Sequence, residues 1–107
     1  MTQLNNLIPV KASIYLLKTE EGGRASGIKT GYRTDHVFEK PKNINDLKAY
    51  GGQINFNDQE FFYPGEVKIV TVKFLRNPIV EQFLKAGQKW YIYEGLRFIG
   101  EGEILEI

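Results

Sequence analysis

The sequence has 107 residues and no cysteine, which excludes a disulfide framework and a thiolate metal site. No apolar run approaches the roughly 20 residues that a membrane-spanning helix needs. Residues 1–9 lack the basic and apolar regions of a signal peptide. His36 is the only histidine, and no His, Asp or Glu spacing matches a metal site. We therefore expect a cytoplasmic protein with no metal, no cofactor and no membrane contact.

An excess of charge of one sign is also missing. Fourteen Lys and Arg residues balance thirteen Asp and Glu residues, so the net charge is +1. Proteins that bind nucleic acid mainly by neutralising phosphates usually carry a marked basic excess. Any contact with RNA is therefore expected to be local.

The sequence is rich in glycine, with eleven residues, and in aromatic residues, at 13%. This composition is typical of a β-rich fold with many turns, and the length fits a single domain over residues 1–107. Alternating apolar and polar positions predict six strands, at 10–17, 32–39, 53–57, 66–75, 89–94 and 97–106. A short helix is predicted over 78–86, because Pro78 precedes apolar residues at helical spacing.

Six strands with turns between them predict an all-β protein, a small closed six-stranded antiparallel β-barrel. Small barrels fill their centre with side chains, so no interior ligand cavity is expected. The inward-facing positions predict a core that contains Ile14, Leu16, Val70, Val72, Phe74 and Ile104. Residues 40–51 are polar and irregular, with a helical turn capped by Asn43 or Asn45 and closed by the glycines at 51 and 52.

Catalytic patterns are weak. Residues 22–30 resemble a phosphate-binding loop, but Ile28 separates Gly27 from Lys29, and the motif needs these two types to be adjacent. His36 is expected at the surface or half-buried, with Asp35 on the opposite face of its strand. We expect neither nucleotide binding nor enzymatic activity.

Several short motifs occur in a fixed order. Glu-Gly-Gly-Arg at 21–24 is followed, after six residues, by Gly-Tyr-Arg at 31–33, and Pro-Gly-Glu at 64–66, Asn-Pro-Ile at 77–79 and Glu-Gly-Leu-Arg at 94–97 come later. Over residues 11–39 and 52–107 the chain resembles the carboxy-terminal β-barrel domain of bacterial elongation factor Tu. The resemblance implies the same barrel and, without a GTPase domain, no GTP hydrolysis. Residues 40–51 have no counterpart of similar length there.

In that family, the region of these motifs meets the acceptor and T-stem backbone of aminoacyl-tRNA. The resemblance therefore implies RNA-binding candidates, which are Arg24, Arg33, Glu94, Gly95 and Arg97, with Lys29 beside them. Thr34 and Asp35 replace the family's Pro-Gln and put a carboxylate where phosphate is expected. The alternative is that these arginines stabilise turns and strand packing.

The strand at 89–94 presents Trp90 and Ile92 on one face and Tyr91 and Tyr93 on the other. Exposed aromatic side chains mark protein interfaces, so Tyr91 and Tyr93 are protein-binding candidates; the alternative is ordinary half-buried tyrosines. Our leading hypothesis is a non-catalytic binding module for an unknown protein partner. This partner would belong to the translation machinery or normally recognise the elongation factor, whose surface this chain would mimic. The second hypothesis is a tRNA- or RNA-binding domain.

Overall fold

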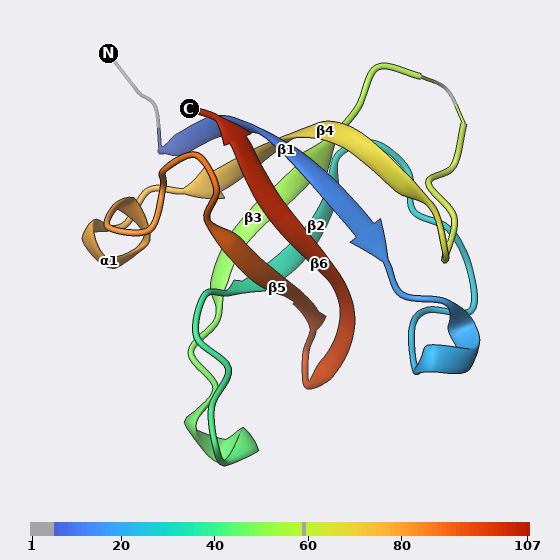
Figure 1. Ribbon diagram of the computed structural model, residues 1–107, viewed down its shortest axis with the longest axis horizontal. Coiled ribbons are helices and arrows are strands. Elements are labelled where there is room, and N and C mark those ends of the chain that lie inside the picture. The colour runs from blue at the N-terminus through green and yellow to red at the C-terminus, as the bar shows by residue number, and fades with distance from the viewer. Residues whose placement is uncertain (1–5, 59) are drawn as a thin grey trace.

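The computed structural model describes residues 6–58 and 60–107, and six strands in it close one antiparallel barrel (Figure 1). The strands are β1 (Leu7–Leu16), β2 (Tyr32–Val37), β3 (Tyr50–Asn55), β4 (Val67–Leu75), β5 (Lys89–Glu94) and β6 (Arg97–Glu106). Their order around the barrel is β1-β4-β3-β2-β5-β6. The predicted fold class is confirmed.

The core follows from the alternation of side chains along the strands. Inward positions of the neighbouring strands β1 and β4 lie side by side on the inner surface of the barrel, as in the pairs Val10 with Val72 and Ala12 with Val70. All six predicted core residues are at most 4% exposed, which confirms their inward assignment. The aromatic rings of Trp90, Phe74 and Phe38 pack together at one part of this core.

Several predicted bounds differ from the structure: β1 begins at Leu7 and not at residue 10, and β2 ends at Val37 and not at residue 39. The helix α1 spans only Pro78–Glu81, because the next N–H groups bond closer carbonyls, as Phe83 N does with Val80 O at 2.9 Å. The strand predicted at 53–57 is β3, and it begins earlier, at Tyr50. The glycines at 51 and 52 belong to this strand instead of closing a helical turn. No helix in the described parts of the chain is long and apolar enough to cross a membrane.

The segment between β2 and β3 projects from one side of the barrel (Figure 1). It contains a 3₁₀ helix, Ile44–Asp46, whose cap is Asn43. The Asn43 side chain accepts a hydrogen bond from Asn45 N at 2.9 Å, so Asn43 is the cap of the two that were predicted, Asn43 or Asn45.

His36 was expected at the surface or half-buried, and this was wrong, because the side chain is completely buried. The indole N–H of Trp90 donates to His36 Nδ1 at 3.0 Å. The other ring nitrogen, Nε2, lies 2.9 Å from Thr34 Oγ1. Both nitrogens therefore have partners inside the barrel, which makes burial of the neutral ring tolerable. Burial lowers the pKa of His36 to about 3.

Gly52 passes directly over this ring. A Cβ atom at position 52 would lie 2.8 Å from His36 Nε2 and 2.9 Å from the Lys73 carbonyl oxygen. Only glycine lets β3 approach the histidine so closely. This packing explains the glycine at position 52, whereas a Cβ atom on Gly51 would make only ordinary contact with Leu75, at 3.7 Å.

Candidate functional site

Arg24 and Glu94, two of the RNA-binding candidates, bind each other. Arg24 lies in the loop after the 3₁₀ helix Thr19–Glu21, and its guanidinium forms an ion pair with the Glu94 carboxylate at the end of β5. The same guanidinium donates to Tyr32 Oη at 2.7 Å and lies 4.8 Å from the centre of the Tyr32 ring. The Tyr32 hydroxyl in turn donates to Glu94. The cluster joins the loop to β2 and β5.

The electrostatics of this cluster fit an internal role. The Arg24 and Glu94 side chains are 18% and 24% exposed, so most of each is covered. Burial and the bond to Glu94 raise the pKa of Tyr32 above its ordinary value. Arg24 also donates from Nε to the Ser26 carbonyl at 3.1 Å. With these donors engaged, the geometry favours the alternative in which Arg24 stabilises a turn.

Arg33, Glu94 and Gly95 line one groove of about 600 Å³ on the barrel surface. Asp35 lies in the same groove, and its carboxylate accepts a hydrogen bond from Gly95 N at 3.2 Å. Arg97 is exposed and pairs in register with Glu94. The groove thus brings one guanidinium beside two carboxylates, and a phosphate entering it would meet both signs of charge.

Lys29 lies apart from this groove. Its ammonium lies 5.4 Å from the centre of the Phe61 ring, and Lys29 is not among the residues that line the groove. The structure therefore brings together Arg24 with Glu94, and Arg33 with Glu94 and Gly95, but leaves Lys29 separate.

The two tyrosines of β5 differ in exposure. Tyr91 is half-buried, as the alternative interpretation held, whereas Tyr93 is only 6% exposed and offers little surface to a partner. A register irregularity between Ile92 and Tyr93 pairs Tyr93 with Phe98 of β6, whose ring centre lies 5.5 Å away. Lys40 then covers this aromatic cluster, at 4.1 Å from the Phe98 ring and 4.6 Å from the Tyr91 ring.

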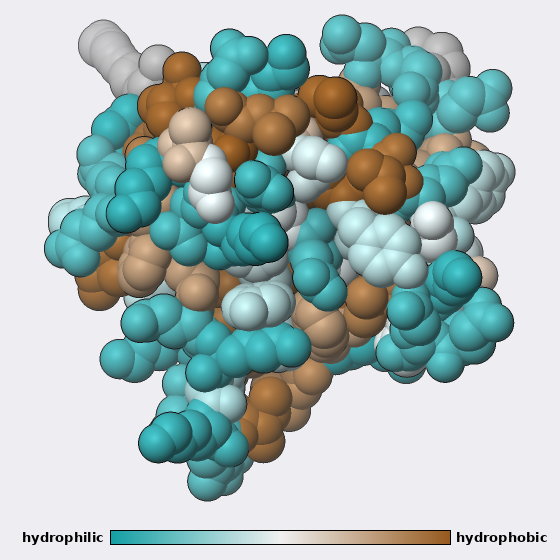
Figure 2. All heavy atoms as spheres, in the orientation of Figure 1, coloured by the Kyte–Doolittle hydropathy of each residue, from teal (hydrophilic) through white to brown (hydrophobic). Residues whose placement is uncertain are grey.

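An exposed apolar surface lies elsewhere, on the outer side of β4. Val67 and Ile69 are 66% and 60% exposed, and they pair across the strands with Tyr15 and Ser13 of β1. In Figure 2 hydrophobic side chains gather over β4, beside hydrophilic ones over β6. The sequence carried a signal for this surface, because Val67 and Ile69 alternate with the inward set of β4, but that signal was not recognised.

This surface continues around the outside of the barrel, from β4 over β1 and β6 to β5. A shallow hollow of about 280 Å³ begins at Val67 and ends at Tyr91 on β5. It is lined by Ser13, Tyr15, Val67, Lys89, Trp90, Tyr91, Glu101, Gly102 and Glu103. We call the outer surface formed by Val67, Ile69, Tyr15, Tyr91, Glu101 and Glu103 the apolar–acidic face. Within residues 6–58 and 60–107, no three His, Cys, Asp or Glu side chains form a group that could hold a metal ion.

Comparison with protein families agrees with the barrel and with the motifs around these surfaces. A family model described as the elongation factor Tu C-terminal domain matches residues 5–107. The match covers nearly the whole chain, including the Glu-Gly-Gly-Arg and Gly-Tyr-Arg motifs that contribute Arg24 and Arg33. The chain therefore belongs to the elongation factor Tu C-terminal domain family.

Proposed function

We propose that this chain is a non-catalytic domain that binds a protein partner through its apolar–acidic face. The partner belongs to the translation machinery or normally recognises the elongation factor, so that the chain acts as a mimic of the factor's surface. The observation that carries this proposal is the exposure of Val67 and Ile69, 66% and 60%, at successive outward positions of β4. Burying such a side chain in an interface contributes about 1.5–3 kcal/mol.

The closed barrel restricts how a partner can bind. Each of the six described strands pairs with a neighbour on both sides, and unpaired strand backbone is confined to strand ends such as residues 7–10 of β1, which pair with β4 but not with β6. We therefore expect recognition to come mainly from side chains on the outer surface. The apolar–acidic face combines apolar and aromatic side chains, of the kind found at the centres of protein interfaces, with charged side chains of the kind found at their rims.

The proposal of a non-catalytic role is supported by the position of the titratable groups. Both ring nitrogens of His36 are engaged inside the core, where no substrate reaches them. Glu101 and Glu103 are exposed on the outer side of β6. A general base needs a positioned partner in a cleft, and neither arrangement offers one.

The test is an affinity capture that compares the wild-type protein with a Val67→Ser, Ile69→Ser double variant. We expect the wild-type protein to retain a component of the translation machinery and the double variant to lose it. A Leu96→Ser variant is the matched control, because Leu96 is 71% exposed but lies in the turn between β5 and β6. Equal recovery with all three proteins contradicts the proposal.

Binding to tRNA is the second candidate, and the exposure of Arg33 and Arg97 beside Gly95 favours it. If this candidate is right, the wild-type protein binds tRNA in a gel-shift assay at low ionic strength, and its binding falls steeply as salt is added. The Arg33→Ala, Arg97→Ala double variant does not bind tRNA under the same conditions. Arg24 is left unchanged in this test, because its contact with Glu94 makes a loss of stability the expected result. Absence of tRNA binding at low ionic strength rejects this candidate.

A further inference from the structure

We propose that the partner segment carries a lysine or arginine, and that this cation binds against Glu101 between Tyr15 and Tyr91. The inference rests on the proposed function, since it specifies the chemistry of the partner at the same face. It is argued from the strand register, the charges, the shape of the hollow and the neighbouring apolar residues.

The strand register aligns Tyr15, Glu101 and Tyr91 in one row on the outer surface, perpendicular to the strands. Tyr15 of β1 pairs directly with Glu101 of β6, and Glu101 pairs directly with Tyr91 of β5. All three line the same hollow on the outer surface. Neighbouring strands lie about 4.8 Å apart, so the two tyrosines are roughly 10 Å apart with the carboxylate between them. A cation held there meets a carboxylate and two aromatic side chains.

The charges leave Glu101 without a counterion. No ion pair involves Glu101 among the residues that the structure describes, and both of its cross-strand neighbours are tyrosines. In the next row Glu103 faces Lys89, and the Lys40 ammonium lies 4.6 Å from the Tyr91 ring, so two carboxylates and two ammonium groups lie at or beside the hollow. Of the two carboxylates, Glu101 is the one without a basic cross-strand neighbour, and it therefore favours a basic group on the partner.

Residue 102 faces the barrel interior, between the outward-facing Glu101 and Glu103, so the floor of the hollow here is the backbone of β6. A Cβ atom there would lie 2.5 Å from Trp90 Cη2, so the indole ring packs against the backbone of β6 from inside. The side chains of Tyr15, Tyr91, Glu101 and Glu103 border this hollow of about 280 Å³.

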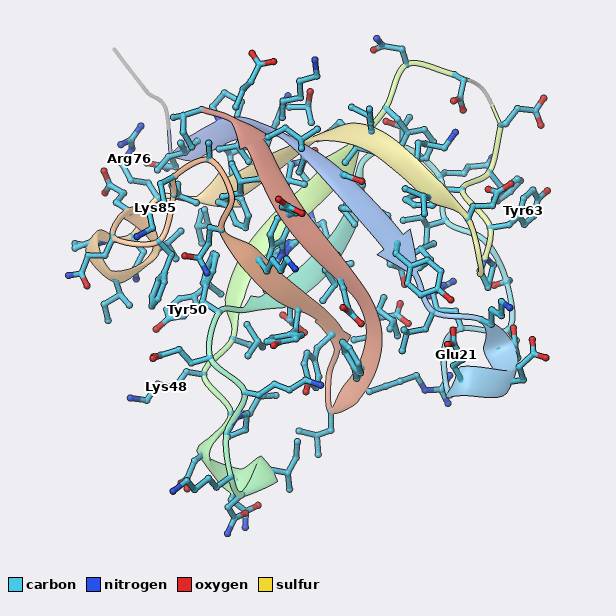
Figure 3. All side chains as sticks on the ribbon, viewed as in Figure 1. Glu21, Lys48, Tyr50, Tyr63, Arg76 and Lys85 are labelled. Atoms are coloured by element: carbon cyan, nitrogen blue, oxygen red, sulfur yellow. The ribbon has the colours of Figure 1, made fainter. Side chains whose placement is uncertain are left out.

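The two tyrosines are held in place by other contacts. The Tyr15 hydroxyl donates to Glu21 Oε1 at 2.5 Å, and Glu21, labelled in Figure 3, ends the 3₁₀ helix that follows β1. The Tyr91 ring packs against Phe98, with ring centres 5.8 Å apart. Lys40 already places an ammonium 4.6 Å from the Tyr91 ring, so this ring attracts a cation within the chain itself.

The apolar part of the face sets the rest of the partner's chemistry. Val67 pairs directly with Tyr15, so the exposed apolar residues adjoin the row that holds the cation. The matching segment therefore presents a lysine or arginine next to apolar side chains. An acidic segment, or a nucleic acid backbone, would be repelled by Glu101 and Glu103.

Photocrosslinking identifies the segment that binds. Benzoylphenylalanine replaces Thr71, which faces outward beside Ile69 and leaves the face itself intact. The full-length protein is irradiated in a lysate of its source cells, and the crosslinked peptide is sequenced by mass spectrometry. We expect a segment of another protein with a lysine or arginine beside apolar residues. A segment without either cation, or a crosslink to a second copy of this chain, overturns the inference.

A double-mutant cycle on a synthetic peptide of that segment then tests the ion pair. Glu101→Gln is expected to raise the dissociation constant about 3- to 10-fold, whereas Glu60→Gln, a matched exposed carboxylate outside the hollow, leaves it unchanged. Replacing the basic residue of the peptide by norleucine gives a similar loss, and the two changes together cost no more than one. Additive losses, or no loss with Glu101→Gln, overturn the inference.

A Val67→Ser variant separates this failure from failure of the proposed function. If Val67→Ser weakens peptide binding and Glu101→Gln does not, the face binds a partner, but the inference that a basic residue of that partner binds Glu101 is wrong. If neither variant weakens binding, or no crosslink forms, both the inference and the proposed function at this face are wrong. All variants are compared at equal folded fraction, measured by thermal unfolding.

Discussion

His36 makes the stability of this protein depend on pH in a range where few other groups change charge. The ring is completely buried, and burial holds its pKa at about 3 in the folded state. In the unfolded chain the same group titrates near pH 6.5. Because the indole N–H of Trp90 can only donate, His36 Nδ1 must accept, and the proton of the neutral ring lies on Nε2 towards Thr34.

The sign and size of the effect follow from this difference. Below about pH 6.5 the unfolded state binds a proton that the folded state does not, so stability falls as pH falls. Each pH unit costs about 1.4 kcal/mol, which amounts to roughly 2 kcal/mol between pH 6.5 and pH 5. The loss continues until the pH approaches the folded pKa of about 3. For a domain of ordinary stability, about 5–15 kcal/mol, this is a large fraction.

The assay is urea unfolding, followed by tryptophan fluorescence, at a series of pH values from neutral to mildly acidic. His36→Gln is the matched variant, because it removes the titration and keeps an amide that can bond Trp90. The variant is expected to be less stable at neutral pH, yet its stability declines less steeply on acidification. The carboxylates contribute equally to both proteins and cancel in the comparison. Parallel curves for the two proteins would refute the reasoning.

Three further predictions concern the packing of the barrel and its chemistry. Arg24→Ala lowers the free energy of unfolding by about 1–3 kcal/mol, since it leaves the covered Glu94 carboxylate without its cationic partner and with only the Tyr32 hydroxyl; a loss below about 0.5 kcal/mol in urea unfolding argues against this role. Gly102→Ala costs about 1–3 kcal/mol and alters tryptophan fluorescence, because its Cβ would meet Trp90 Cη2 at 2.5 Å; an unchanged midpoint and spectrum contradict this packing. Isothermal titration with GTP or GDP gives no binding heat, because Ile28 interrupts the loop motif; saturable micromolar binding would refute this expectation.

The strands of the barrel could be predicted from sequence because their apolar residues alternate clearly. In β4 the inward residues Val70, Val72 and Phe74 recur at every second position, and this periodicity depends on local geometry alone. The start of β3 could not be predicted, because its two glycines resemble a turn. They belong to a strand because they pair with β2, and Gly52 also with β4, and because His36 packs against Gly52, contacts that depend on the tertiary fold.

The surfaces were harder to predict, because exposure depends on contacts between strands. Tyr93 lies on the outward side of β5, as alternation requires, yet the register irregularity with β6 brings Phe98 across it. Arg24 matches a family motif, but its pairing with Glu94 joins residues 70 positions apart. Neither the register irregularity nor the pairing of Arg24 with Glu94 leaves a local pattern in the sequence. The exposure of Val67 and Ile69, by contrast, was readable from the alternation of β4.

The central claim, that the apolar–acidic face binds a protein partner, is tested most directly by affinity capture with the Val67→Ser, Ile69→Ser variant. The account predicts that the wild-type protein and the Leu96→Ser control retain the same translation-related partner, and that the double variant loses it while keeping its thermal stability. Retention of that partner by the folded double variant would contradict the account.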